Sequence, residues 1–131
     1  MCKHRNQKDH NQSFLEDLIR DYPNNYFDWK ITVLFYISIH LIRDFAFKKR
    51  SVEISKSHRA VFEFLEQETS KSSQVYKSFS ILFRNCRDCR YNGFTTEDAF
   101  EKFCEVKFNE SQMHLNKIEA YFNSQNSKKA S

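Results

Sequence analysis

The chain has 131 residues, among them one glycine and one proline, and a formal net charge of +4. This length suits one domain with a sizeable core. So few turn-forming residues exclude a many-stranded sheet and favour long helices joined by few loops. The mild positive charge is explained by solubility as readily as by nucleic-acid binding, and so it does not identify a function.

Residues 1–12 are polar and lack the apolar stretch of a signal peptide, which predicts a polar N-terminal tail ahead of the domain. The first helix is expected to begin after Ser13, because Glu16 follows three residues later and completes a capping box. Turn-forming residues at 21–25 end this helix. The domain is predicted to span residues 13–123, followed by a polar C-terminal tail at 124–131.

The second predicted helix, from about residue 26 to residue 49, is the most informative part of the sequence. Its residues 31–42 are apolar on nearly every side, which is typical of the central helix of a bundle. The run is too short to span a bilayer, so we expect a cytoplasmic protein that does not enter a membrane. One stripe, formed by Trp29, Val33, Tyr36, His40 and Arg43, nevertheless carries polar groups, among them a phenol and an imidazole. Buried polar groups need partners, which the rest of the chain must supply.

Two helices are predicted after a short loop. Ser57 is a good N-cap for a helix that continues to about residue 68. A polar connector then leads to a helix over about residues 74–91. Its expected buried stripe consists of Val75, Phe79, Leu82, Cys86 and Cys89. The apolar spacing predicts that both helices pack against the central one.

A fifth helix is predicted at the C-terminal end. Gly93 is typical of the end of the preceding helix. Thr95 and Asp98 form a second potential capping box. The apolar residues that follow predict a helix that is either continuous or bent near residues 109–111.

Arginines gather near the end of the fourth predicted helix. Arg84, Arg87 and Tyr91 share one helix face by their spacing, whereas Arg90 leans toward the apolar stripe. Guanidinium groups suit phosphate because each offers planar, paired donors, and a neighbouring tyrosine can stack on a base. The alternative is a solvated basic face with one arginine that bridges the bundle.

A second possible anion site lies at the start of the third predicted helix. His58 and Arg59 would add donors to the helix N-terminus, which itself favours anions. Simple capping by Ser57 is the alternative. An antiparallel bundle would bring this helix start, the His40 region and the arginine-rich segment together, although spacing alone does not prove it.

The pair Cys86 and Cys89 is a weak metal signal, because a structural zinc site needs four ligands. Cys104 and His114 are the remote candidates for completing such a site. A second paired motif is absent from the sequence, so we expect neither a metal nor another cofactor. The four cysteines are most simply reduced thiols.

Several residues, taken in order, resemble a HEPN-type helical domain, and in particular a group of small bacterial HEPN-like proteins. The matching residues are Asp28-Trp29, Phe35-Tyr36 with His40, Ser57-His58 and Arg90-Tyr91, with Leu115 and Ile118-Glu119 similar to the last helix. The resemblance implies an up-and-down bundle of about five helices that is often dimeric. Many members act on RNA, as metal-independent ribonucleases or as non-catalytic partners of nucleotidyltransferases and defence systems.

The catalytic members of that superfamily carry an arginine, often followed by asparagine, and a histidine four to six residues later. Arg84-Asn85 stands where this motif would start, but Cys89, Arg90 or Tyr91 occupies the expected histidine position. None of these replaces an imidazole at neutral pH. The segment from Arg5 to His10 fits the motif literally but lies in the predicted tail, where one loose match is expected by chance.

We therefore expect a non-catalytic RNA- or nucleotide-associated binding module in a stress or defence system, with a homodimer and a nucleotidyltransferase as candidate partners. The candidate ligand-binding residues are Tyr36, His40, His58, Arg59, Arg84, Arg87, Arg90 and Tyr91. One alternative is a ribonuclease in which His40 or His58 serves as the displaced catalytic imidazole. Another is a purely structural domain for homodimerisation or partner binding.

Overall fold

The computed structural model describes residues 3–91 and 97–128, with side chains described for 7–89 and 98–125. These residues form five helices and no strand: α1 (Lys3–Asp21), α2 (Phe27–Arg50), α3 (His58–Glu68), α4 (Gln74–Tyr91) and α5 (Glu97–Lys128). The predicted all-α, five-helix fold is confirmed. The expected cap at Thr95 and stop at Gly93 lie outside the described residues.

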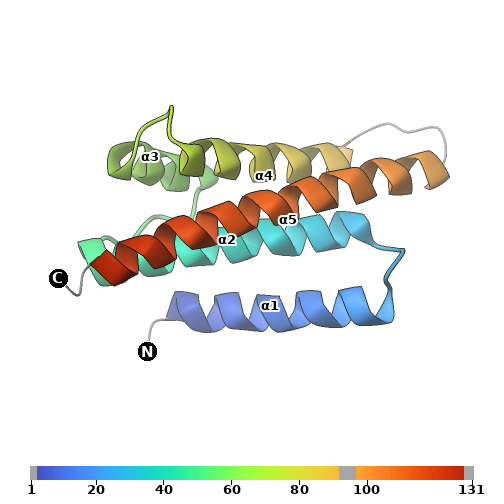
Figure 1. Cartoon of the computed structure of the whole chain (residues 1–131), viewed down its shortest axis with the longest axis horizontal. Helices are drawn as coiled ribbons and strands as arrows, with labels where there is room; N and C mark the ends of the chain where they lie inside the picture. The colour runs from blue at the N-terminus through green and yellow to red at the C-terminus, as the bar shows by residue number, and fades with distance from the viewer. Residues whose placement is uncertain (1–2, 92–96, 129–131) are drawn as a thin grey trace.

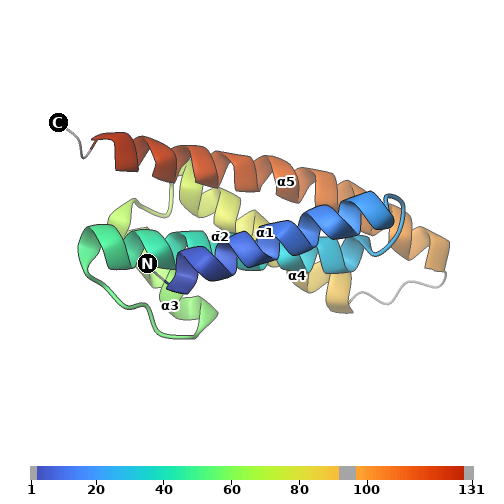
Figure 2. The ribbon, with the colours of Figure 1, turned by 90° about the horizontal axis from the view of Figure 1, so that it is seen from below.

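Helix α2 is the centre of the bundle and packs against each of the other four helices among the described residues. Figure 1 shows α1 antiparallel to α2, and α4 antiparallel to both α2 and α5. The short helix α3 lies at the end of the bundle where α2 ends and α4 begins. Figures 1 and 2 both place the beginning of α1 at this same end.

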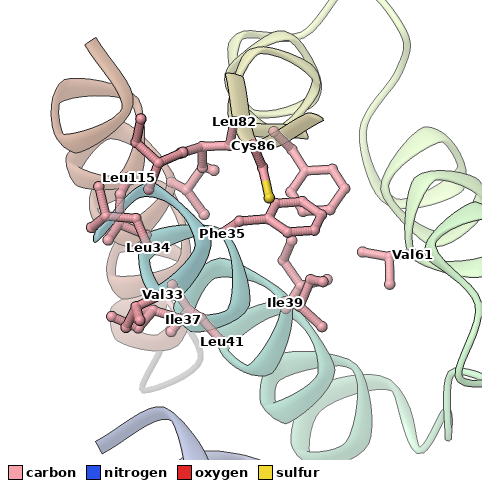
Figure 3. Close-up of a cluster of buried hydrophobic side chains, with 14 of the residues drawn as sticks. Val33, Leu34, Phe35, Ile37, Ile39, Leu41, Val61, Leu82, Cys86 and Leu115 are labelled. Atoms are coloured by element: carbon pink, nitrogen blue, oxygen red, sulfur yellow. The ribbon is translucent and has the colours of Figure 1, made fainter. Parts of the chain in front are cut away.

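The core forms around α2 because this helix has apolar side chains on all sides. Figure 3 shows Leu34, Phe35 and Ile39 pointing away from α2 in different directions, toward the surrounding helices. Ile31, Leu34 and Ile37 have no or almost no exposed surface. The prediction of a central helix is confirmed, although Trp29, on the polar stripe, is 57% exposed.

Local signals in the sequence identify α3 and α4 correctly. The side chain of Ser57 accepts a hydrogen bond from the Ala60 backbone N–H at 3.1 Å, as expected of an N-cap. The predicted stripe of α4 is buried over its whole length, from Val75 to Cys89. Helix α5 is one continuous helix, which is one of the two alternatives that the sequence left open.

The predicted start of the first helix is wrong. Helix α1 begins at Lys3, and Ser13 lies within it as an exposed residue and not at its N-cap. The first half of α1 is polar and is held by polar contacts of its side chains. Gln7 donates a hydrogen bond to Asn11, and Nζ of Lys8 lies 4.0 Å from the carboxylate of Glu119 in α5. At the other terminus, α5 continues to Lys128 and so extends beyond the predicted boundary at residue 123.

Within residues 3–91 and 97–128, no helix combines the length and the hydrophobicity that crossing a bilayer requires. Helix α2 is long enough, with 24 residues. Its apolar run is, however, bounded by Lys30 on one side and by Arg43 and Asp44 on the other, all of which are buried in the bundle.

Candidate functional site

A cavity of about 580 Å³ lies at the end of the bundle where α1, α2 and α3 meet. Its volume falls within the range of small-molecule sites. Residues 51–57, which connect α2 to α3, form one wall and are called the connector below. The lining residues are Gln7 from α1, Tyr36, Ile39, His40 and Arg43 from α2, Glu53, Ile54, Ser55 and Lys56 from the connector, and His58 from α3.

Helix α2 presents one face to this cavity. Tyr36, His40 and Arg43 follow one another at steps of four and three residues, so they lie along one stripe of the helix. Tyr36 and His40 are partly buried, whereas Arg43 keeps only 9% of its surface exposed. The stripe that the sequence singled out therefore supplies an aromatic ring, an imidazole and a guanidinium to a single cavity.

Arg43 fixes the connector to α2. Its Nη2 donates a hydrogen bond to the backbone oxygen of Ser55 at 2.6 Å. Burial lowers the pKa of Arg43, and the nearby Glu53 carboxylate acts in the opposite direction; the guanidinium nevertheless stays charged at physiological pH. Its Nε is buried, and no described residue accepts a hydrogen bond from it.

This buried donor has an energetic consequence. A charged donor without an acceptor in a protein interior costs about 1–3 kcal/mol or more. Nε itself has almost no accessible surface, so a ligand in the cavity meets the other parts of the guanidinium, whose positive charge attracts an anionic oxygen. The arrangement thus favours an anion in the cavity.

His58 is the first residue of α3, directly after the Ser57 cap. Its ring meets the edges or faces of Phe35, Phe83 and Tyr36, with centroid distances of 5.2, 5.8 and 6.3 Å. This aromatic packing sets the position of the imidazole at the cavity wall. The N-terminus of α3 adds partial positive charge at the same point.

Among the described residues that line the cavity, Arg43 and Lys56 are positive and Glu53 is negative, so positive charge is in excess when the histidines are neutral. His40 and His58 add ring nitrogens that donate or accept according to their protonation. The cavity is therefore suited to a small anion that carries an apolar or aromatic portion.

The predicted arginines of α3 and α4 do not line this cavity. Arg59 is 89% exposed and pairs with Glu63 at 3.0 Å. Arg84 lies 3.6 Å from Glu110, and Arg87 lies 3.5 Å from Asp88. The side chains of the remaining two candidates, Arg90 and Tyr91, lie outside the described residues. The structure thus brings together Tyr36, His40 and His58, and leaves the three described arginines elsewhere.

Several polar residues of the cavity were not among the predicted site residues, and Gln7, Arg43 and Lys56 are three of them. Arg43 had a visible signal, because it stands three residues after His40 on the same stripe. The other two had none, because Gln7 belongs to the expected tail and Lys56 to a polar loop.

A second cavity, of about 450 Å³, lies on the other side of the connector and shares Ile54 and Ser55 with the first. Its arginine, Arg50, makes two hydrogen bonds to the Glu68 carboxylate, at 2.7 and 2.6 Å. This guanidinium is already engaged by a carboxylate, and so the first cavity is the better candidate for an anion.

The cysteines form a buried group between α4 and α5. Cys86, Cys89 and Cys104 are all buried thiols, and burial is the main cause that raises the pKa of Cys89 and Cys104. His114 is engaged by Ser78 at 2.9 Å. Within the described part of the chain, no three His, Cys, Asp or Glu side chains are arranged to hold a metal ion.

Comparison of the chain with models of protein families, with curated proteins and with solved structures found no match in any of the three. The functional argument therefore rests on the cavity and on the chemistry of its lining.

Proposed function

We propose that this chain is a non-catalytic, HEPN-like helical module that binds RNA or a nucleotide through a phosphate group held in the cavity between α2 and the connector. Arg43 and Lys56 would carry the phosphate charge, with His40 and His58 as further donors. Tyr36 would stack against a base, a contact that tolerates any base because each has a π-face.

The observation that carries this proposal is that Arg43, Lys56 and the imidazoles of His40 and His58 line one cavity. Phosphate oxygens suit a guanidinium because they accept from adjacent N–H groups in one plane. The nearby start of α3 favours negative charge for an independent reason, because the aligned peptide dipoles of a helix leave partial positive charge at its N-terminus.

The HEPN resemblance supports the same proposal. The five-helix architecture is of the kind that the resemblance implies. Tyr36, His40 and His58 belong to the residue set that carries it, and all three line the cavity. A homodimer, a nucleotidyltransferase partner and a stress or defence setting go with this resemblance and form part of the proposal.

Binding of fluorescein-labelled RNA, measured by anisotropy, together with calorimetry on AMP, tests the proposal. Lys56→Ala removes an exposed cation at the cavity, and we expect it to weaken binding about 3–10-fold, as for a contact worth about 1 kcal/mol. Lys71→Ala makes the same charge change in an exposed residue outside the cavity and should leave affinity unchanged. Equal losses in both variants, or no binding of either ligand, would overturn the proposal.

A ribonuclease is the second candidate, favoured by the presence of His40, His58 and Arg43 around one cavity. A pair of imidazoles can serve as general acid and base on RNA, while a guanidinium stabilises charge on the phosphate. Incubation with RNA in EDTA distinguishes the two functions. Cleavage that disappears in both His40→Gln and His58→Gln would establish the enzyme, whereas binding without cleavage supports the non-catalytic module.

A further inference from the structure

We infer that the cavity holds a single phosphate with its adjoining nucleoside, as in a mononucleotide or the phosphorylated end of an RNA, and not a strand that runs across the surface. This inference rests on the proposed function and specifies its ligand class. It depends on which arginines already pair with a carboxylate, because, among the described residues, the arginines of α3 and α4 do so and Arg43 in the cavity does not.

Proteins that bind single strands use a positively charged groove that tracks several successive phosphates. The described arginines of α3 and α4 are the candidates for forming such a groove, but each one already lies beside a carboxylate. Arg59 pairs with Glu63, Arg84 with Glu110 and Arg87 with Asp88. Each pair would have to be broken, at least in part, before its arginine could bind a phosphate.

Arg43, which lines the cavity, is held in a different way. Among the described residues, its guanidinium donates to the Ser55 backbone oxygen at 2.6 Å and makes no hydrogen bond to a carboxylate. Such an anchored guanidinium presents its remaining donors at a fixed point, so it suits one phosphate in one place. The only acidic side chain that lines the described cavity, Glu53, is exposed on the connector.

The remainder of the cavity fits a nucleoside. Its volume of about 580 Å³ exceeds what a lone phosphate needs. Apolar groups of Ile39 and Ile54 and the partly buried ring of Tyr36 line it. An aromatic ring beside aliphatic side chains is a suitable surface for a planar base.

Affinity as a function of oligonucleotide length tests the inference. The ligands are AMP, adenosine, 5′-phosphorylated octaadenylate and the same octamer with a 5′-hydroxyl. We expect AMP to bind at least tenfold more tightly than adenosine, and the phosphorylated octamer to bind no more than about threefold more tightly than AMP. Binding of the phosphorylated octamer indicates an RNA end as the source of the phosphate, and its exclusion indicates a free mononucleotide.

Salt dependence gives a second measure. One or two phosphate contacts predict a slope of log K against log salt between about −0.7 and −1.4 for a single-stranded ligand. A slope steeper than about −3 in the octamer, together with binding at least tenfold tighter than AMP, would overturn the single-phosphate inference. It would leave the proposed function standing. Failure of every phosphate-bearing ligand to bind would overturn the proposed function itself.

Variants of Tyr36 separate the base from the phosphate. We expect Tyr36→Leu to weaken AMP binding about tenfold, because stacking on an aromatic ring is worth roughly 1–3 kcal/mol per base. Tyr36→Phe keeps the ring and should retain the affinity for AMP. Both variants should bind ribose 5-phosphate as the unaltered chain does. Equal AMP affinity in the Leu and Phe variants would contradict the placement of the base at Tyr36.

Discussion

Ser78 and His114 join α4 to α5 through a buried hydrogen bond, with Oγ and Nδ1 2.9 Å apart. Gln74 donates to the same hydroxyl oxygen at 2.9 Å. The simplest arrangement therefore has Ser78 donating its proton to Nδ1, which leaves the proton of neutral His114 on Nε2. The oxygen of Ser78 has a second lone pair, so a protonated His114 could also donate to it. The stability of the interface depends on pH because burial disfavours the charged imidazole.

Burial lowers the pKa of His114 below the ordinary value of 6.5, and the neighbouring Lys117 acts in the same direction. The unfolded chain therefore binds a proton at a higher pH than the folded one. The free energy of unfolding should fall as the pH decreases through 6.5 and should level off below the pKa of the folded state. Urea unfolding between pH 7.5 and pH 5 measures this dependence. His114→Gln should flatten it, and an equally steep dependence in the variant would contradict the assignment.

Lys30 is a charged residue in the core, 1% exposed. Its Nζ donates to the backbone oxygen of Tyr22 and lies 4.3 Å from the centre of the Phe27 ring. Burial is the main cause that lowers its pKa, so the charge is costly at this site. We expect Lys30→Met, which keeps the volume, to change the free energy of unfolding by less than about 1.5 kcal/mol.

Lys30→Ala provides the comparison, because it leaves a cavity and should lower stability by about 2–4 kcal/mol. Chemical denaturation of the two variants under identical conditions distinguishes packing from charge. If Lys30→Met proves as destabilising as Lys30→Ala, the hydrogen bond to Tyr22 matters more than the volume of the side chain.

Ser51 ends α2 in a left-handed conformation, with φ of 56° and ψ of 36°. A side chain at such a position is strained relative to glycine. Ser51→Gly should therefore raise the free energy of unfolding by roughly 0.5–1 kcal/mol, after the greater flexibility of unfolded glycine is taken into account. Thermal unfolding checks this, with Ser51→Val as the opposite change. A loss of stability in Ser51→Gly would refute the prediction.

Phe79 connects three helices in the core. Its ring stacks on Phe35 of α2 at 5.5 Å and meets Phe62 of α3 at 4.8 Å. Phe79→Ala should lower the free energy of unfolding by about 3–5 kcal/mol, because it empties a fully buried site. Phe14→Ala removes the same group from an exposed position of α1 and should cost less than about 1 kcal/mol. Urea midpoints compare the two, and similar losses would be inconsistent with this core.

The parts of the fold that sequence reasoning predicts well are those set by local signals. The cap at Ser57 and the buried stripe of α4 depend on residues within one or two helical turns. The start of α1 was missed because its polar half is helical without apolar periodicity. Its contacts, such as the one between Lys8 and Glu119, join residues far apart in the sequence, and spacing along one segment does not reveal them.

The same limit explains the site. Spacing placed Tyr36 and His40 on one stripe, and the structure adds His58 to the same cavity. Spacing along one segment indicates only the ion pairs that form within that segment. Arg59 pairs with Glu63 one turn along α3, a contact visible in the sequence. The pairing of Arg84 with Glu110, and the anchoring of Arg43 by Ser55, depend on how separate segments meet.

Because Cys86, Cys89 and Cys104 are buried free thiols, their reaction with a thiol reagent can report on the opening of the helix bundle. A thiol reagent reaches these sulfurs when α4 separates from α5 or, for Cys86, from α2 (Figure 3), so the rate of alkylation at each one measures the local opening equilibrium. Read by mass spectrometry with and without AMP, the three rates would reveal whether an occupant at one end of the bundle stiffens the helices at the other.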